Sequence, residues 1–121
     1  MFHEAGLFVS GGAETTRTVI SHGLRAFCNF PEQWELLAER PELMSSAVEE
    51  LLRWVTPLNN MFRTVRHDTE VGGQAMAAGD RVMLLYPSAN RDEDVFVEPF
   101  RFDVTRDPNP HLAFGLSLIH I

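Results

Sequence analysis

The sequence predicts a mainly α-helical fold that carries a small antiparallel β-sheet, an α+β class. Apolar and small residues in the first half recur three and four residues apart, which is the period of a helix face. After Pro57 the pattern changes to short apolar runs separated by glycine turns, which is typical of strands. These β elements are too few to close a sheet domain alone. With 121 residues, of which 45% are hydrophobic, the chain fits one domain with a buried core.

A long helix is expected over residues 2–30. One face of it carries positions spaced by four and three residues: Leu7, Gly11, Thr15, Thr18 and His22. Gly11 and Gly12 lie within this helix, where each glycine costs roughly 1 kcal/mol relative to alanine. The pair therefore predicts either a kink or the close approach of another group to the helix backbone.

Two shorter helices are expected over residues 31–39 and 41–54. Pro31 and Pro41 both suit the first turn of a helix, where the missing N–H group costs nothing. Pro57 ends the second of these helices, because a proline cannot continue the helical hydrogen bonding.

The β-rich part is expected to form one small antiparallel sheet near residues 63–86. Residues 70–76 predict a hairpin, because Gly72-Gly73 suits a two-residue turn. A second turn is expected at residues 78–80. The apolar strand that follows, residues 82–86, stops at Pro87. A short helical turn and an irregular, proline-interrupted run complete the chain.

Composition and charge exclude several classes of function. The net charge of −7 and the isoelectric point near 5.1 argue against nucleic acid and against an anionic membrane surface. Cys28 is the single cysteine, so no intrachain disulfide can form. The sequence has no apolar run of about 18 residues or more that would span a membrane, and its start lacks a basic signal-peptide region. A cytoplasmic location is the expectation.

The first pattern that could carry chemistry is Gly11-Gly12-Ala13-Glu14-Thr15-Thr16. Taken alone, it is compatible with an ordinary surface pair of glutamate and threonine. In the chemical interpretation, the glycines thin the helix so that a small ligand can lie against it. The Thr15 hydroxyl could then hydrogen-bond a bound dioxygen, or the carbonyl four residues back. The Glu14 carboxylate could relay protons as a general acid does.

Three further patterns follow along the chain. Glu50 and Arg53 are spaced i, i+3 on a helix face, which by itself is a common surface ion pair. Arg63 enters the β region and could bind a carboxylate through its bidentate fork, although a solvated strand arginine is the plain alternative. Residues 99–103 and 110–115 are rich in aromatic side chains, and Phe100 and Phe102 are expected to pack against the core. Arg101 between them could reach back to Glu50.

In this order the four patterns resemble the C-terminal half of the cytochrome P450 family, from its oxygen-binding helix to the start of its haem loop. The resemblance covers essentially the whole chain up to Gly115. A finer similarity to soluble actinobacterial members lies in residues 49–54, 60–64 and 88–93. It implies a partial cytochrome P450 fold, and we expect residues 1–121 to be a partial domain truncated at both ends.

The resemblance also implies roles for individual residues. Thr15 is similar to the oxygen-activating threonine, with Glu14 as the acid beside it and Gly11 and Gly12 as the glycines against the cofactor. Glu50, Arg53 and Arg101 resemble the three members of the family's structural ion-pair network. The remaining implied positions are Arg63 and His111 at the haem propionates, Phe114 and Gly115 at the start of the haem loop, and Leu58 and Asn59 in the substrate pocket.

The end of the sequence departs from the family pattern. The loop reads F-G-x-G-x-H-x-C, and counting from Phe114 places its iron-ligating cysteine at position 121, which is Ile121. Ser117 and Ile119 replace the second glycine and the histidine. Cys28 is expected near the C-terminal end of the long helix, where the dipole disfavours a thiolate. We therefore expect no metal ligand and no catalysis from this polypeptide by itself.

The function implied for the parent enzyme is that of a haem-thiolate monooxygenase, which inserts one oxygen atom of O₂ into a C–H bond of a hydrophobic small molecule. A steroid side chain or a lipid is the implied substrate, and NAD(P)H the implied electron source through a ferredoxin-type redox partner. A non-catalytic helical interaction module is the alternative. A zinc hydrolase built on His3, Glu4 and His22 is a third hypothesis, although the second histidine of H-E-x-x-H is missing.

Overall fold

The computed structural model describes the backbone of residues 2–115 and the side chains of residues 11–115. In chain order its elements are α1 (Phe2–Asn29), α2 (Pro31–Glu39), the 3₁₀ turn η1 (Pro41–Leu43), α3 (Met44–Val55), β1 (Asn60–Thr64), β2 (Thr69–Val71), β3 (Gln74–Met76), β4 (Arg81–Leu85) and α4 (Tyr86–Ala89). Ser117, Ile119, His120 and Ile121 lie outside the described residues, as do the side chains of His3, Glu4 and Leu7.

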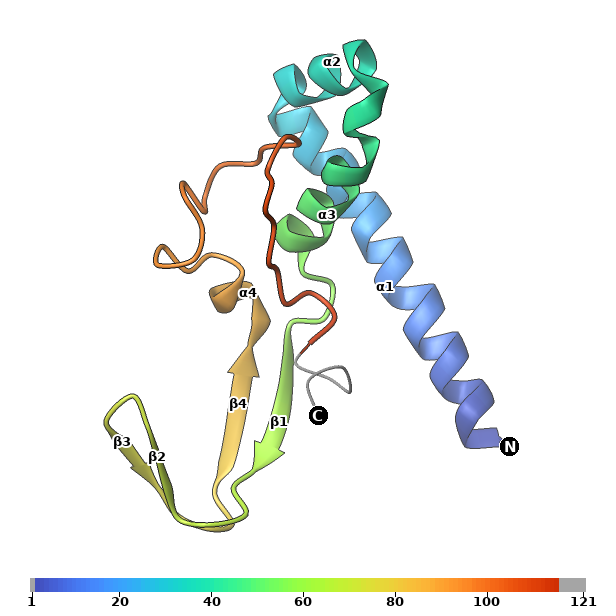
Figure 1. The fold of residues 1–121 in the computed structure, drawn as a ribbon. Helices are drawn as coiled ribbons and strands as arrows, with labels where there is room; N and C mark the ends of the chain where they lie inside the picture. The colour runs from blue at the N-terminus through green and yellow to red at the C-terminus, as the bar shows by residue number, and fades with distance from the viewer. Residues whose placement is uncertain (1, 116–121) are drawn as a thin grey trace.

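The helices follow the predicted boundaries closely. Pro31 begins α2, whereas Pro41 opens a single 3₁₀ turn, so the third helix begins at Met44 and not at position 41. Of the two alternatives for Gly11 and Gly12, a kink or the close approach of another group, the kink is absent from the described helix: α1 continues through both glycines without a break (Figure 1). A Cβ atom added at either glycine would meet nothing within 4 Å, so the backbone there borders open space.

The β-rich part forms two separate two-stranded sheets within residues 2–115, where one sheet was predicted. β1 pairs antiparallel with β4, placing Arg63 opposite Val82, and β2 pairs with β3 in the expected hairpin. Gly72 and Gly73 have φ of 58° and 80°, the left-handed values that a tight hairpin turn requires. The hairpin is splayed to the side of the β1–β4 pair (Figure 1), and the two pairs stay separate.

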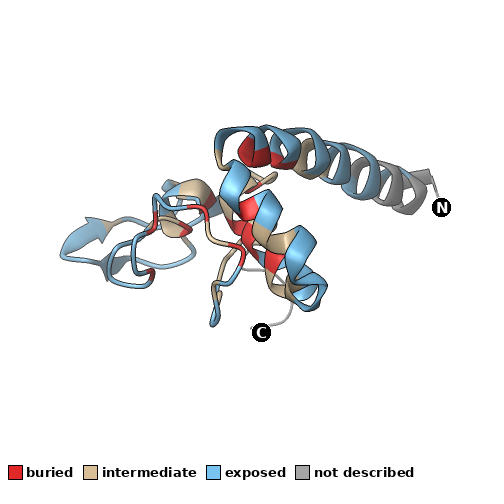
Figure 2. Ribbon diagram, turned by 90° about the horizontal axis from the view of Figure 1, so that it is seen from above, coloured by how far each residue is buried: buried red, intermediate tan, exposed pale blue. Residues whose placement is uncertain are grey.

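The core lies where the helices meet the late irregular segment. Its fully buried members are Ala26, Phe27, Ala47, Phe102 and Val104. Figure 2 shows that burial is concentrated on α3, on the C-terminal part of α1 and on the irregular segment, while the strands are mostly exposed. The expectation for Phe102 is confirmed, but Phe100 is 66% exposed, because it lies in a turn just before the stretch whose Phe102 and Val104 enter the core.

The irregular segment after α4 is held to the helices by polar contacts as well as by Phe102. The N–H of Val104 donates to Oε1 of Gln33 at 2.9 Å, and the Ser46 hydroxyl donates to the carbonyl of Val104 at 2.7 Å. These contacts lay the segment alongside α3 (Figure 1). Within the described residues, no helix is long and apolar enough to cross a membrane.

Candidate functional site: a buried charge network beside an apolar cavity

The fully buried Glu50 carboxylate is the centre of a hydrogen-bond network. Its Oε1 accepts from Nη2 of Arg53 at 2.8 Å and from the N–H of Asp103 at 3.0 Å. Its Oε2 accepts from Nε of Arg53 at 2.7 Å, from Nε of Arg106 at 3.1 Å and from Nδ2 of Asn109 at 3.0 Å. Both oxygens of this buried carboxylate therefore have hydrogen-bond donors from the protein.

Arg53 is equally buried, and every one of its N–H groups has a partner. Two of its donors form the bidentate pair with Glu50. The others bind backbone carbonyls of the irregular segment: Nη1 donates to Asn90 at 2.8 Å and to Pro99 at 2.9 Å, and Nη2 donates to Arg101 at 3.1 Å. Arg53 therefore joins α3 to three points of a segment without regular secondary structure, and a common surface ion pair is excluded as its role.

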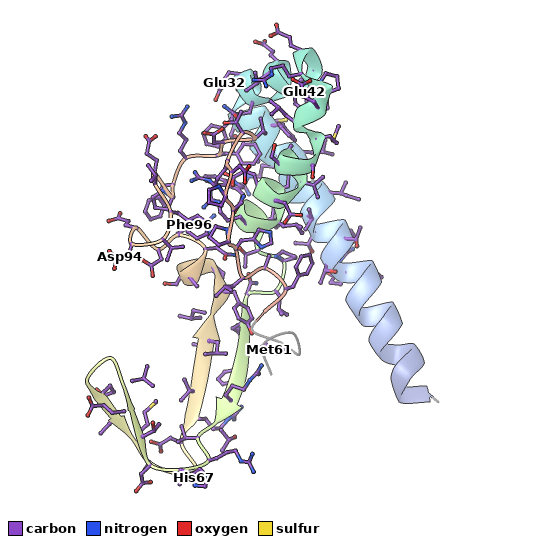
Figure 3. The ribbon with its side chains drawn as sticks, viewed as in Figure 1. Glu32, Glu42, Met61, His67, Asp94 and Phe96 are labelled. Atoms are coloured by element: carbon purple, nitrogen blue, oxygen red, sulfur yellow. The ribbon has the colours of Figure 1, made fainter. Side chains whose placement is uncertain are left out.

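The third charged member of the network is Arg106, and the prediction of Arg101 in that place is wrong. The Arg101 side chain is 57% exposed and pairs with Glu98 at 3.2 Å, so only its backbone carbonyl reaches Arg53. The Arg106 side chain is 10% exposed and contacts Glu50 directly. Phe96 lies on the loop after α4 (Figure 3), and its ring packs against the guanidinium of Arg53. The distance from the guanidinium carbon to the ring centre is 5.3 Å.

An apolar cavity of about 400 Å³ is lined by α1, by Leu52 of α3, by the loop before β1 and by residues 113–114 of the late irregular segment. Its lining residues are Gly11, Thr15, Thr16, Val19, Ile20, Leu52, Pro57, Leu58, Ala113 and Phe114. The volume falls within the range of small-molecule sites in proteins. Thr15, Leu58 and Phe114, which are distant in sequence, are thereby brought to one site.

Thr15 and Glu14 face different surroundings. Thr15 lines the cavity, and its hydroxyl donates to the carbonyl of Gly11, which is the backbone bond predicted as one of its two possible partners. Glu14 does not line the cavity. Its exposed carboxylate accepts from Nη2 of Arg17 at 2.6 and 2.7 Å. The structure thus supports Thr15 as a cavity group and shows Glu14 as a member of a surface ion pair.

Some of the other predicted site residues line the cavity and others are exposed elsewhere. Leu58 lines the cavity, whereas Asn59 is exposed and contributes its backbone carbonyl to the N–H of Tyr86 at 3.2 Å. Gly11 lines the cavity and Gly12 does not. Arg63 is exposed on β1, and its guanidinium donates to the carbonyl of Phe62 at 3.0 Å.

His111 has partners other than the predicted propionate. Its Nε2 lies 2.8 Å from Oε2 of Glu49, and its Nδ1 accepts from the N–H of Ala113 at 3.2 Å. Because Nδ1 accepts, Nε2 must carry the proton that is donated to Glu49. His111 therefore holds the loop against α3. A propionate contact would require this pair to break, and that contact stays a prediction.

The start of the predicted haem loop is closely fitted to the protein. Phe114 lines the cavity, and Gly115 has a φ of 78°. A Cβ atom added at Gly115 would lie 2.9 Å from the hydroxyl oxygen of the buried Tyr86. Glycine is required here both for the backbone conformation and for the close approach.

The described residues contain no metal-binding cluster. No group of three or more histidine, cysteine or acidic side chains among them could hold a metal ion. Cys28 is exposed and lines a separate apolar hollow with Leu24, Phe27, Pro31 and Trp34. The zinc hypothesis rests partly on His3 and Glu4, whose side chains lie outside the described residues.

Two charged groups near the network have shifted pKa values. For Asp103, burial is the largest single effect and raises the pKa, but the two hydrogen bonds from Thr105 and the charges of Arg101 and Arg106 together lower the pKa below its ordinary value. For Arg91, burial lowers the pKa, and the nearby charge of Arg53 adds to this effect.

Comparison with known proteins agrees with this geometry. The model of the cytochrome P450 family matches residues 31–110. A steroid C26-monooxygenase of Mycobacterium tuberculosis is 50% identical over 114 residues, which cover 94% of this chain and 31% of the relative. A linalool 8-monooxygenase of Pseudomonas putida is 50% identical over 109 residues, covering 90% of this chain and 27% of that relative.

A solved structure shows the same likeness in three dimensions. A Mycobacterium marinum cytochrome P450 in complex with pseudoionone superposes with a TM-score of 0.89 at 45% identity, covering 94% of this chain and 28% of that protein. The chain belongs to the cytochrome P450 family. It spans about 30% of the length of these relatives.

Proposed function

We propose that this chain forms one wall of the haem and substrate pocket of a monooxygenase that inserts one oxygen atom of O₂ into a C–H bond of a hydrophobic small molecule. The observation that carries the proposal is the apolar cavity that joins Gly11 and Thr15 of α1 to Leu58 and Phe114. Leu52, which also lines it, is on the same helix as the buried pair of Glu50 and Arg53, which belongs to the predicted family pattern.

The residues around the cavity fit the edge of a haem. The lining is apolar except for hydroxyl groups, and Gly11 presents backbone without a side chain to open space. Members of the family hold the iron through a cysteine thiolate. Since Cys28 lies in a different hollow, the described residues supply the pocket wall and not the iron ligand. Arg63 is the candidate partner for a propionate, because its exposed guanidinium can form a bidentate pair.

When bound, the haem supplies the oxygen-activating chemistry, and the chain supplies position and protons. The Thr15 hydroxyl can turn from the Gly11 carbonyl toward a ligand in the cavity, because a hydroxyl both donates and accepts. Leu52, Leu58 and Phe114 exclude water and favour an apolar substrate. Glu14 could relay protons to the hydroxyl only after leaving Arg17, so we assign it the outer position of such a relay.

The substrate class and partners follow from the relatives. The names of the relatives specify a steroid and linalool, and the solved neighbour was in complex with pseudoionone. All three are hydrophobic, in agreement with the cavity lining, and a steroid side chain or lipid remains our proposed substrate class. We further propose electron supply from NAD(P)H through a ferredoxin-type partner, and a cytoplasmic location.

A chimera tests the proposal. Residues 11–115 of this chain would replace the aligned segment of the Mycobacterium marinum P450, whose remaining sequence supplies the rest of the domain. We expect the chimera to bind haem and to oxidise pseudoionone. Thr15→Ala should lower the yield of product per NAD(P)H consumed and release peroxide, whereas Thr15→Ser should preserve the yield.

Thr18→Ala is the matched control, because Thr18 lies on the same helix but does not line the cavity. An unchanged product yield in Thr15→Ala would remove Thr15 from the mechanism. A chimera that folds but takes up no haem would favour the non-catalytic interaction module instead.

A further inference from the structure

Asn90 and Thr56 are completely buried polar residues that the proposed chemistry does not use. Asn90 ends the short helix α4, and Thr56 follows the last residue of α3. Thr56 has a φ of 44°, a left-handed conformation that threonine rarely adopts. A β-branched residue in this conformation indicates that its surroundings determine its position.

The two side chains form a hydrogen-bond chain whose direction is fixed. The Thr56 hydroxyl donates to the carbonyl of Arg53 at 2.7 Å, so its oxygen is free to accept from Nδ2 of Asn90 at 2.8 Å. The Oδ1 of Asn90 then accepts from the N–H of Leu112 at 2.7 Å. The Asn90 amide carries its donor and its acceptor on separate atoms, so it can donate at one end and accept at the other.

This hydrogen-bond chain connects two segments that line the apolar cavity. Thr56 immediately precedes the lining residues Pro57 and Leu58. Leu112 immediately precedes the lining residues Ala113 and Phe114. The segment beyond Leu112 is also tied back to it, because the N–H of Gly115 donates to the carbonyl of Leu112 at 2.9 Å.

We propose that Asn90 is a positioning residue that, acting through Thr56, fixes the loop of residues 112–115 relative to the wall formed by Pro57 and Leu58. The importance for oxidation of the distance between this loop and this wall rests on the proposed function, because the same cavity would receive the haem and the substrate. The link itself depends only on the hydrogen bonds and burial of the two side chains.

Residue-resolved amide hydrogen exchange of the 121-residue chain tests the link. Leu112 and Gly115 report on the loop, and Val104 is the internal reference, since its N–H is bonded to Gln33 in a separate contact. Asn90→Leu should accelerate exchange at Leu112 by about tenfold, with a parallel increase at Gly115, while Val104 stays within about twofold.

Two variants at Thr56 separate positioning from general destabilisation. Thr56→Val keeps the side-chain shape but removes the hydroxyl, so it should accelerate Leu112 and Gly115 in the same sense as Asn90→Leu. Thr56→Ser keeps the hydroxyl and should restore the slow exchange. Rescue by serine is not expected if Thr56 acts only by filling space.

Several outcomes would overturn the inference. One is equal acceleration of Val104 and Leu112, which would indicate global unfolding. Another is acceleration at Leu112 without change at Gly115, because the loop would then not be positioned as a unit. Fast exchange of both reporters in the unmodified chain would also refute it. A failure of the proposed function would show instead as absent haem in the chimera, with the exchange pattern unaffected.

Discussion

Replacing Arg106 by alanine should destabilise the fold far more than replacing Arg101. Arg106 donates to the buried carboxylate of Glu50 at 3.1 Å, and its other nitrogens donate to the carbonyls of Val97 at 2.8 Å and Glu98 at 3.3 Å. Its side chain is only 10% exposed. Arg101 has one exposed partner, Glu98, and leaves the network intact when it is removed.

The magnitude follows from what each change leaves behind. Removing one partner of a buried ion pair typically costs about 3–5 kcal/mol, because the other charge stays buried. Glu50 would keep Arg53 and Asn109 as donors, so we expect about 3 kcal/mol for Arg106→Ala. Arg53→Ala removes the closest charge and should lie at the upper end of that range or prevent folding. Arg101→Ala should stay within about 0.5 kcal/mol.

Urea unfolding followed by far-ultraviolet circular dichroism measures these differences as shifts in the transition midpoint at constant slope. Arg106→Lys separates charge from geometry, because lysine keeps the charge but not the planar set of donors. The reasoning is refuted if Arg101→Ala is as destabilising as Arg106→Ala, since the original prediction for Arg101 would then be correct. It is also refuted if Arg106→Ala leaves the midpoint unchanged.

Three further outcomes are expected. Thr105→Val should raise the pKa of Asp103 in an NMR titration, and an unchanged pKa would contradict this. In the unmodified chain the pKa of Asp103 is lower in the folded state than in the unfolded state. Its contribution to the free energy of unfolding is therefore present above the unfolded pKa of about 3.9 and is lost as the pH falls through the folded pKa. Gly115→Ala should lower the free energy of unfolding by about 1–2 kcal/mol, because alanine disfavours the left-handed backbone at this position, and the contact with Tyr86 should lower it further. An unchanged free energy of unfolding would contradict the described position of Gly115. Finally, the absorption spectrum of the 121-residue chain with reduced haem and carbon monoxide should show no red-shifted band of a thiolate ligand, because Cys28 lies outside the cavity. Such a band would show that Cys28 can bind the haem iron.

Local chemistry in the sequence was sufficient for the secondary structure. Pro31 and the switch in period at Pro57 predicted where helices begin and end, and the hairpin at Gly72-Gly73 formed as expected. These features depend on backbone geometry within a few residues, which a single sequence carries. The start of α3 was misplaced by three residues, because a proline suits a 3₁₀ turn as well as an α-helix.

The partner of Glu50 could not be chosen from the sequence. Residues 95–110 have no regular helix or strand, so no periodicity tells which of Arg101 and Arg106 faces α3. The structure places Phe102 and Val104 in the core, and this anchoring turns Arg101 outward and brings Arg106 to the carboxylate. The same holds for Glu14 and Thr15, adjacent residues that the helix directs to solvent and to the cavity respectively.

The sequence by itself therefore determined the helices, the hairpin and the family, because these depend on local backbone preferences and on the order of short motifs. Only the tertiary structure decided which side chains meet: Arg106 with Glu50, His111 with Glu49, and Asn90 with Thr56 and Leu112. Each of these contacts joins residues more than 30 positions apart or depends on an irregular loop. Packing against the aromatic core sets their positions, and no short-range pattern in the sequence encodes that packing.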